Sequence, residues 1–144
     1  MGADIHGVVQ TRRKNNPEAK WVNELEVESS RNYWLFSVLA DVRNHNDFTP
    51  VDNPRGLPGD FELYDLSVTL YWNDIEVWMG DHSFTHYTPR ELLDWDGWDQ
   101  VGGELGDRGT VREACHVFLK WLEYVEAKYT NIHKDVRIVI GFDS

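Results

Sequence analysis

Two polar residues that can share a proton or a metal lie close together near the start of the chain. The sequence ADIHG places Asp4 and His6 two positions apart in a run, residues 3–10, that is typical of a β-strand. Side chains two positions apart in a strand point to the same face, so the carboxylate and the imidazole can meet. Such a pair can hold a divalent metal, or Asp4 can orient and charge His6 as a general base. A purely structural hydrogen bond near a strand end is the alternative.

A second group of candidate residues lies in DHSFTHYT, residues 81–88. His82 and His86 are four positions apart, which suits two ligands of one metal ion on a helix. The segment alternates as an extended strand does, however, and in a strand these residues would be about 13 Å apart. We therefore expect His82, with Asp81 or Ser83 beside it, to be the binding residue of this segment.

Several arginines fall on or next to predicted loops. Arg43 closes a predicted helix, and Arg55 lies in NPRGLPG, where proline and glycine can hold a side chain in a fixed direction. A guanidinium donates two parallel hydrogen bonds, which suits a phosphate or a carboxylate. Arg137 shares a predicted strand face with Asp143. For each arginine taken singly, pairing with a nearby acid or a helix end is the alternative.

The spacing of apolar residues and the capping residues predict the strands and helices that must position these side chains. Residues 3–10 and 21–27 predict a β-hairpin, and 136–144 predict a buried strand. Capping boxes at Thr88 and Thr110 predict helices over 89–94 and 111–129. Residues 33–43 carry apolar side chains at helical spacing after Asn32, a suitable N-cap. Residues 61–79 fit either a strand or a helix.

This order of elements predicts one α+β domain, with helices packed on one face of a small, mainly antiparallel sheet. The first and last strands can lie side by side in such a sheet. Residues 44–60 contain three prolines and two glycines and form a long loop between elements. Long loops in compact domains often carry function, so we expect this one to contribute to a site.

The charge of the chain is uneven. The net charge is −11, and residues 60–107 hold twelve acidic residues and one basic residue, Arg90. Such a field disfavours nucleic acid and membrane surfaces as partners, and fits a basic protein, a cation or solubility alone. The single Cys115, the lack of a leader-like start and the lack of a long apolar run predict a cytoplasmic protein.

Five segments together resemble a family of small phage and bacterial proteins that begin MGADIH. Here they read MGADIH (1–6), RNYWLFSVLADVRN (31–44), PRGLP (54–58), DHSFTHYT (81–88) and VRIVIGFDS (136–144). The third and fourth segments are mainly loop and strand-end sequence. The resemblance implies a phage or prophage origin and a common site at which these segments converge. The family pattern DxHS is shortened to DHS here, which changes the expected direction of Asp81.

These observations predict an accessory protein that binds a small phosphorylated or nucleotide-like ligand without a cofactor, and that sequesters an immune signal of the host. The predicted ligand-binding residues are Asp4, His6, Arg43, Arg55, His82, Ser83 and Asp143. One alternative is a phosphoester hydrolase whose divalent metal is held by Asp4, His6 and His82. Another is an acidic inhibitor that docks on a host enzyme. A site shared between subunits of a homo-oligomer is compatible with each.

Overall fold

A four-stranded antiparallel sheet, in the order β2-β1-β8-β5, is the centre of the fold in the computed structural model. The structure describes residues 2–27, 29–63, 69–72, 75–102 and 109–144. The sheet strands are β1 (Asp4–Arg13), β2 (Val22–Glu26), β5 (His82–Tyr87) and β8 (Lys134–Asp143). β1 and β2 form the predicted hairpin, and β8 begins two residues before the predicted strand. The predicted α+β class is confirmed.

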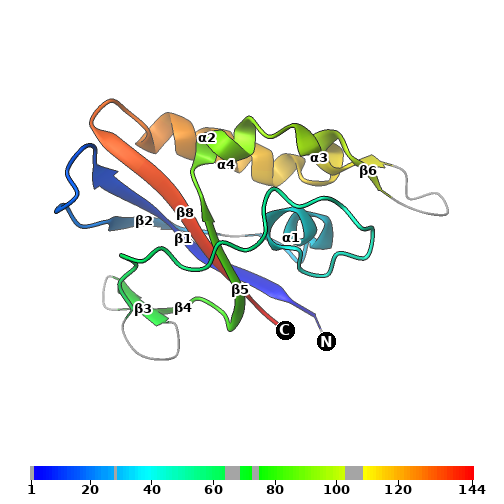
Figure 1. Ribbon diagram of the computed structural model, residues 1–144, viewed down its shortest axis with the longest axis horizontal. Coiled ribbons are helices and arrows are strands. Elements are labelled where there is room, and N and C mark those ends of the chain that lie inside the picture. Colours follow the sequence, from blue (N-terminus) through cyan, green and yellow to red (C-terminus); the bar gives the residue numbers. More distant parts are fainter. Residues whose placement is uncertain (1, 28, 64–68, 73–74, 103–108) are drawn as a thin grey trace.

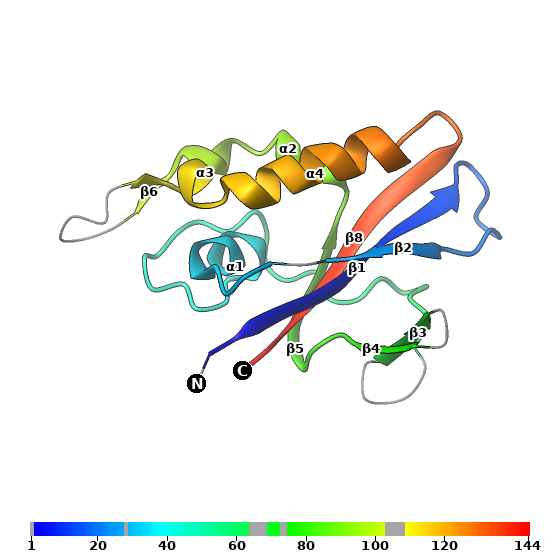
Figure 2. The ribbon, with the colours of Figure 1, turned by 180° about the vertical axis from the view of Figure 1, so that it is seen from behind.

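The longest pairing joins the first and last strands. β1 and β8 run antiparallel over ten residues each, from Asp4 opposite Asp143 to Arg13 opposite Lys134. The two chain ends therefore lie next to each other, as Figures 1 and 2 show from opposite sides. This register decides which of the predicted site residues can meet.

The helices cover one face of this sheet (Figure 1). They are α1 (Tyr33–Ala40), α2 (Pro89–Leu93), α3 (Val111–Ala114) and α4 (His116–Tyr129), with a short 3-10 helix η1 (Asp96–Asp99) and the small strands β6 (Val101–Gly102) and β7 (Gly109–Thr110). Large side chains from the helices and the sheet, among them Phe36, Trp98, Leu122 and Phe142, are almost fully buried between the two layers. Their burial is the main apolar contribution to stability.

A small hairpin covers part of the other face of the sheet (Figure 2). β3 (Thr69–Trp72) and β4 (Ile75–Trp78) pair antiparallel, and a second apolar cluster joins Leu70, Val77 and Met79 to Val8 and Val139 of the sheet. This settles residues 69–72 and 75–78 as strand rather than helix. Residues 64–68 and 73–74 of the ambiguous segment lie outside the described residues.

Two predicted helices have different bounds in the structure. The predicted helix over 33–43 ends at Ala40, because Asp41 adopts a left-handed conformation and its N–H bonds back to the last turn. Arg43 therefore follows the helix instead of closing it. The predicted helix over 111–129 is divided at Cys115, whose φ of −108° separates α3 from α4. Both predicted capping threonines accept the expected hydrogen bond from the third residue of the helix.

Candidate functional site

His6 and Asp143 form a close pair at the end of the sheet where the chain termini meet. The register places Asp143 opposite Asp4, so the Asp143 carboxylate lies diagonally across from His6 on the same face. His6 Nε2 is 2.6 Å from Asp143 Oδ2, and the His6 ring packs at 5.0 Å from the ring of Trp78. Both side chains are about a quarter exposed. The pair can act as an oriented imidazole, which is the arrangement a general base requires.

Asp4 has a different partner from the predicted one. Its carboxylate accepts two hydrogen bonds from Arg31, at 2.8 and 3.2 Å. The hydrogen bond from Arg31 holds the pKa of Asp4 below its usual value. Asp143 also accepts a bond from the backbone N–H of Asp4. It is therefore Asp143, and not Asp4, that orients His6, and we call Asp4, His6, Arg31 and Asp143 the terminal cluster.

His82 lies at the same end of the sheet but on its other face. It is paired with Phe142, and the side chains of Phe142 and Asp143 point to opposite faces because they are neighbours in one strand. The His82 ring bonds Ser83 Oγ at 2.9 Å and Ser144 Oγ at 3.1 Å. Ser83 has a φ of 56° where the β5–β8 register shifts, so it is part of a bulge. Asp4 and His6 therefore do not share a face with His82.

Asp4, His6 and His82 do not come together as the ligands of one metal ion. Within residues 2–27, 29–63, 69–72, 75–102 and 109–144, no three His, Cys, Asp or Glu side chains come together in a way that could hold a metal ion. The divalent metal of the hydrolase alternative stays a prediction.

Arg43 lies in the loop that follows α1. Its φ is 53°, and its guanidinium lies 5.6 Å from the centre of the Tyr33 ring. The Tyr33 hydroxyl accepts a hydrogen bond from the backbone N–H of Ala3, so Arg43 reaches the neighbourhood of the terminal cluster. Phosphate binding by Arg43 stays a prediction.

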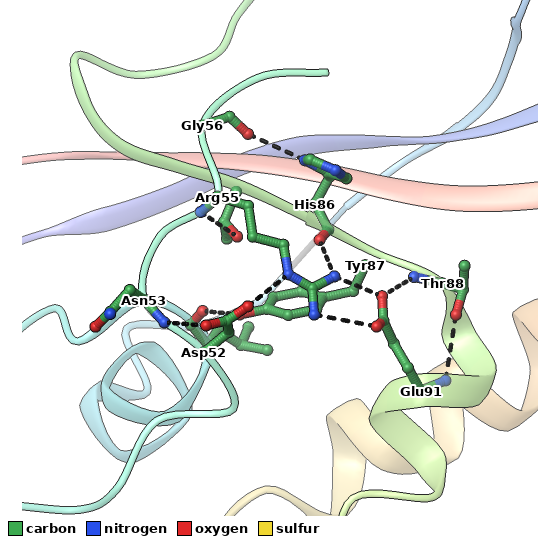
Figure 3. A network of polar contacts seen from close by, with 10 residues as sticks. Asp52, Asn53, Arg55, Gly56, His86, Tyr87, Thr88 and Glu91 are labelled. Carbon is green, nitrogen blue, oxygen red and sulfur yellow. Dashed lines mark hydrogen bonds and ion pairs between the residues drawn. The ribbon is translucent and has the colours of Figure 1, made fainter. Parts of the chain in front are cut away.

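Arg55 is held by a network of polar contacts that Figure 3 shows. Its guanidinium donates to both carboxylate oxygens of Glu91, at 2.8 and 3.1 Å, and to Asp52 at 3.1 Å. It also bonds the backbone carbonyl of His86 and stacks 4.4 Å above the Tyr87 ring. The hydrogen bond from Glu91 raises the pKa of Arg55. A phosphate would have to compete with two carboxylates for this guanidinium.

The same network explains what the long loop does in the fold. The N–H groups of Arg55 and Gly56 bond Thr85 Oγ1 and the Phe84 carbonyl, so the loop covers the outer edge of β5. Glu91 also accepts from the N–H of Thr88, which completes the predicted capping box of α2. Residues 52–56 thus protect a sheet edge and tie it to a helix start. Arg55 and Arg43 share no partner among the described contacts.

A surface cavity of about 470 Å³ lies at the opposite end of β8 from the terminal cluster. β5 pairs with β8 only over residues 138–142, so the first residues of β8 are left uncovered on that side. We call this space the β8 cavity. Its cationic side chains are Lys14, Arg90, Lys134 and Arg137, its carboxylates are Glu126 and Asp135, and its other lining residues are Trp21, Pro58, His86, Thr88, Pro89, Thr130 and Val136.

Arg137 is the most buried cation of this cavity, with 8% of the residue exposed. Its guanidinium stacks 3.9 Å from the Trp21 ring, and it donates to Asp60 at 2.7 Å and to Gln10 at 2.8 Å. Its Nη2 is buried and has no hydrogen-bond partner in the part of the chain that the structure describes. Burial lowers the pKa of Arg137, while the bond to Asp60 opposes this change.

The hydrogen bond between Arg137 and Asp60 also changes the pKa of Asp60. Partial burial alone would raise its pKa, but the hydrogen bonds from Arg137 and Trp21 outweigh that effect and lower it. Arg12 lies on the Trp21 ring as well, 4.6 Å from its centre, and its buried Nε has no hydrogen-bond partner among the described residues. Two guanidinium groups thus share the carboxylate of Asp60 at this ring.

Sequence reasoning did not select the residues of this cavity. The sequence pattern places Arg137 on a strand face with Asp143, and Trp21 and Lys14 in a hairpin and its turn, with no indication that they meet. One signal was present: Arg137 interrupts the apolar run VRIVIGF, and a charge inside a buried strand needs partners.

Comparison with known proteins finds no family model, no curated protein and no solved structure that matches this chain. The resemblance to proteins that begin MGADIH stays a prediction from five motifs. Across the part of the chain that the structure describes, none of the helices combines the length and apolar character needed to cross a bilayer.

Proposed function

We propose that this protein binds a small phosphorylated, nucleotide-like ligand, and that the ligand occupies the β8 cavity. The observation that carries the proposal is Arg137, which is more than nine-tenths buried and lines the cavity. A guanidinium that is shielded from water attracts an anion strongly, because little solvent screens its charge.

The charge and size of the cavity support the same ligand class. Four cationic side chains line it against two carboxylates, and one of these, Glu126, is paired with Arg90 at 2.7 Å. A volume of about 470 Å³ falls within the usual range for small-molecule sites. Arg137 is paired with Asp60, and Arg90 with Asp94 and Glu126, so the positive charge that can attract an anion there comes mainly from Lys14 and Lys134.

Calorimetric titration with pyrophosphate and with adenosine 5′-monophosphate tests the proposal. We expect saturable binding that weakens at least tenfold in Arg137→Met, since a charge-assisted hydrogen bond contributes about 1.5–3 kcal/mol. Arg112→Met is the matched control, because Arg112 is exposed and, among the described residues, forms an ion pair with Asp99 alone. Failure of both ligands to bind at millimolar concentration, or equal affinity in both variants and the natural protein, would overturn the proposal.

A second candidate function is acid–base chemistry at the terminal cluster. The 2.6 Å contact between His6 and Asp143 favours it, and none of the described residues bonds the other ring nitrogen of His6. We expect hydrolysis of an activated phosphodiester that His6→Gln abolishes and that His116→Gln, an exposed control, retains. Equal turnover in the two variants would exclude His6 as the base.

The biological setting belongs to the same proposal. A phage or prophage origin, a cytoplasmic location, a homo-oligomer and the sequestration of an immune signal are predictions from the sequence alone. Docking of the acidic segment 60–107 on a host protein is also still a prediction, and residues 64–68, 73–74 and 103–107 of that segment lie outside the described residues.

A further inference from the structure

Val136 lies where the outer edge of β8 has no neighbouring strand. Ile138 is paired with Tyr87 of β5, and four residues before it the N–H of Lys134 donates to the carbonyl of Asn131. Val136 lies midway between these two positions and lines the β8 cavity. The residue as a whole is buried, and the only polar groups it can offer a ligand are its backbone N–H and C=O.

The direction of the Val136 backbone follows from the strand alternation. The carbonyl of Phe142 accepts the N–H of Asp81, which places it on the β5 side of β8. In an antiparallel strand the N–H and C=O of one residue point to the same side, and every second residue repeats that direction. Ile140, Ile138 and Val136 therefore direct their backbone groups to the β5 side as well.

At Val136 no strand among the described residues pairs on that side. Neither a strand pairing on β5 nor any other hydrogen bond among the described residues reaches its N–H or C=O. The cavity thus presents one donor and one acceptor on one residue, next to the apolar surfaces of Pro58 and Pro89 and to four cations. A bound group that supplies both partners is favoured, since backbone groups shielded from water need partners.

We propose that the ligand of the β8 cavity carries a planar ring with an adjacent donor and acceptor, as a nucleobase does, and that this edge pairs with the N–H and C=O of Val136. The ring would lie among the apolar lining residues, and its phosphate would face the cations. This inference rests on the proposed function and names the ligand class more closely. An added peptide strand fits less well, because Val136 is the one residue between Lys134 and Ile138 that directs its backbone groups to that side.

Three phosphorylated probes separate the ring from the phosphate. Adenosine 5′-monophosphate has the ring edge, its N6,N6-dimethyl derivative lacks the ring's N–H donor, and ribose 5-phosphate lacks the ring. We expect the first to bind at least tenfold more tightly than the other two. In ¹⁵N-resolved NMR spectra, the Val136 amide should move on addition of adenosine 5′-monophosphate and not on addition of ribose 5-phosphate.

The possible outcomes distinguish this inference from the proposed function. Equal affinities for all three probes with a stationary Val136 amide would overturn the ring pairing, while the Arg137-dependent phosphate site would stand. Absence of binding by every probe would overturn both. If the dimethyl derivative binds as tightly as the parent nucleotide, the ring does not use its donor at Val136, and the inference is wrong.

Discussion

Asp60 and Arg137 form an ion pair whose two members are buried to very different degrees. The Arg137 side chain is 9% exposed and the Asp60 side chain 50% exposed, and their nearest atoms are 2.7 Å apart. A buried charge that loses its partner cannot recover hydrogen bonds from water, whereas a half-exposed charge can. Removing one member should therefore cost much more than removing the other.

In Asp60→Ala, Arg137 Nη1 loses its partner and joins Nη2, which already lacks one. Breaking a fully buried pair costs about 3–5 kcal/mol, and because Asp60 is half exposed we expect about 2 kcal/mol. Arg137→Met leaves no buried charge. Gln10 Oε1 and Asp60 Oδ1 lose a donor, but Asp60 is half exposed and can bond water instead. The new apolar side chain offsets part of the loss, so we expect at most about 1 kcal/mol.

Urea unfolding followed by circular dichroism measures the free energy of unfolding of each variant. The loss of about 2 kcal/mol in Asp60→Ala should also lower its Tm by about 4–8 °C. The double variant should resemble Arg137→Met, since no buried charge remains to be paired. If Arg137→Met proves as destabilising as Asp60→Ala, the argument from unequal burial is refuted.

The pKa of Asp60 is lowered in the fold, so its contribution to the free energy of unfolding depends on pH. This contribution should be fully present above the usual carboxyl pKa and lost as pH falls through the pKa of the folded state.

Three other substitutions or modifications test the packing of the helical layer. Tyr87→Phe should cost about 1–2 kcal/mol in urea unfolding, because the buried carbonyl of Leu39 loses its donor at 2.8 Å; an unchanged midpoint would contradict this. Leu122→Ala should cost about 2–5 kcal/mol, whereas Val117→Ala, at 71% exposure, should stay within about 0.5 kcal/mol. Burial raises the pKa of Cys115 to about 12, so a thiol reagent at pH 8 should label it only after unfolding; rapid labelling of the folded protein would show that Cys115 is accessible.

Local sequence signals predicted most of the elements, because each depends on neighbours in the chain. The capping-box sequences at Thr88 and Thr110 predicted two helix starts, and both helices begin there. The full box forms at Thr88, whereas at Thr110 the threonine side chain accepts the N–H of Glu113 without the reciprocal bond. Alternation and apolar runs predicted β1, β5 and β8 for the same reason. The helix ends were less well predicted, since Asp41 in the left-handed region and the break at Cys115 have no strong local signature.

The candidate site needed information that no local pattern contains. The sequence suggested that Asp4 meets His6, but the antiparallel register of β1 and β8 brings Asp143 to His6 and leaves Asp4 to Arg31. Likewise, residue types alone favoured Arg55 for a phosphate, and only the fold shows that Glu91 and Asp52 already bind it.

The sequence by itself determined the types of element, their order and the acidic character of the chain, because propensity, capping and charge are properties of short segments. The tertiary structure decided which polar groups pair and which are left over. Arg137 lies at the β8 cavity with an unpartnered nitrogen because β5 stops pairing at Ile138 and because Trp21 and Asp60, from distant segments, pack around it. Contacts between residues so far apart depend on strand register and layer packing, which only the whole fold specifies.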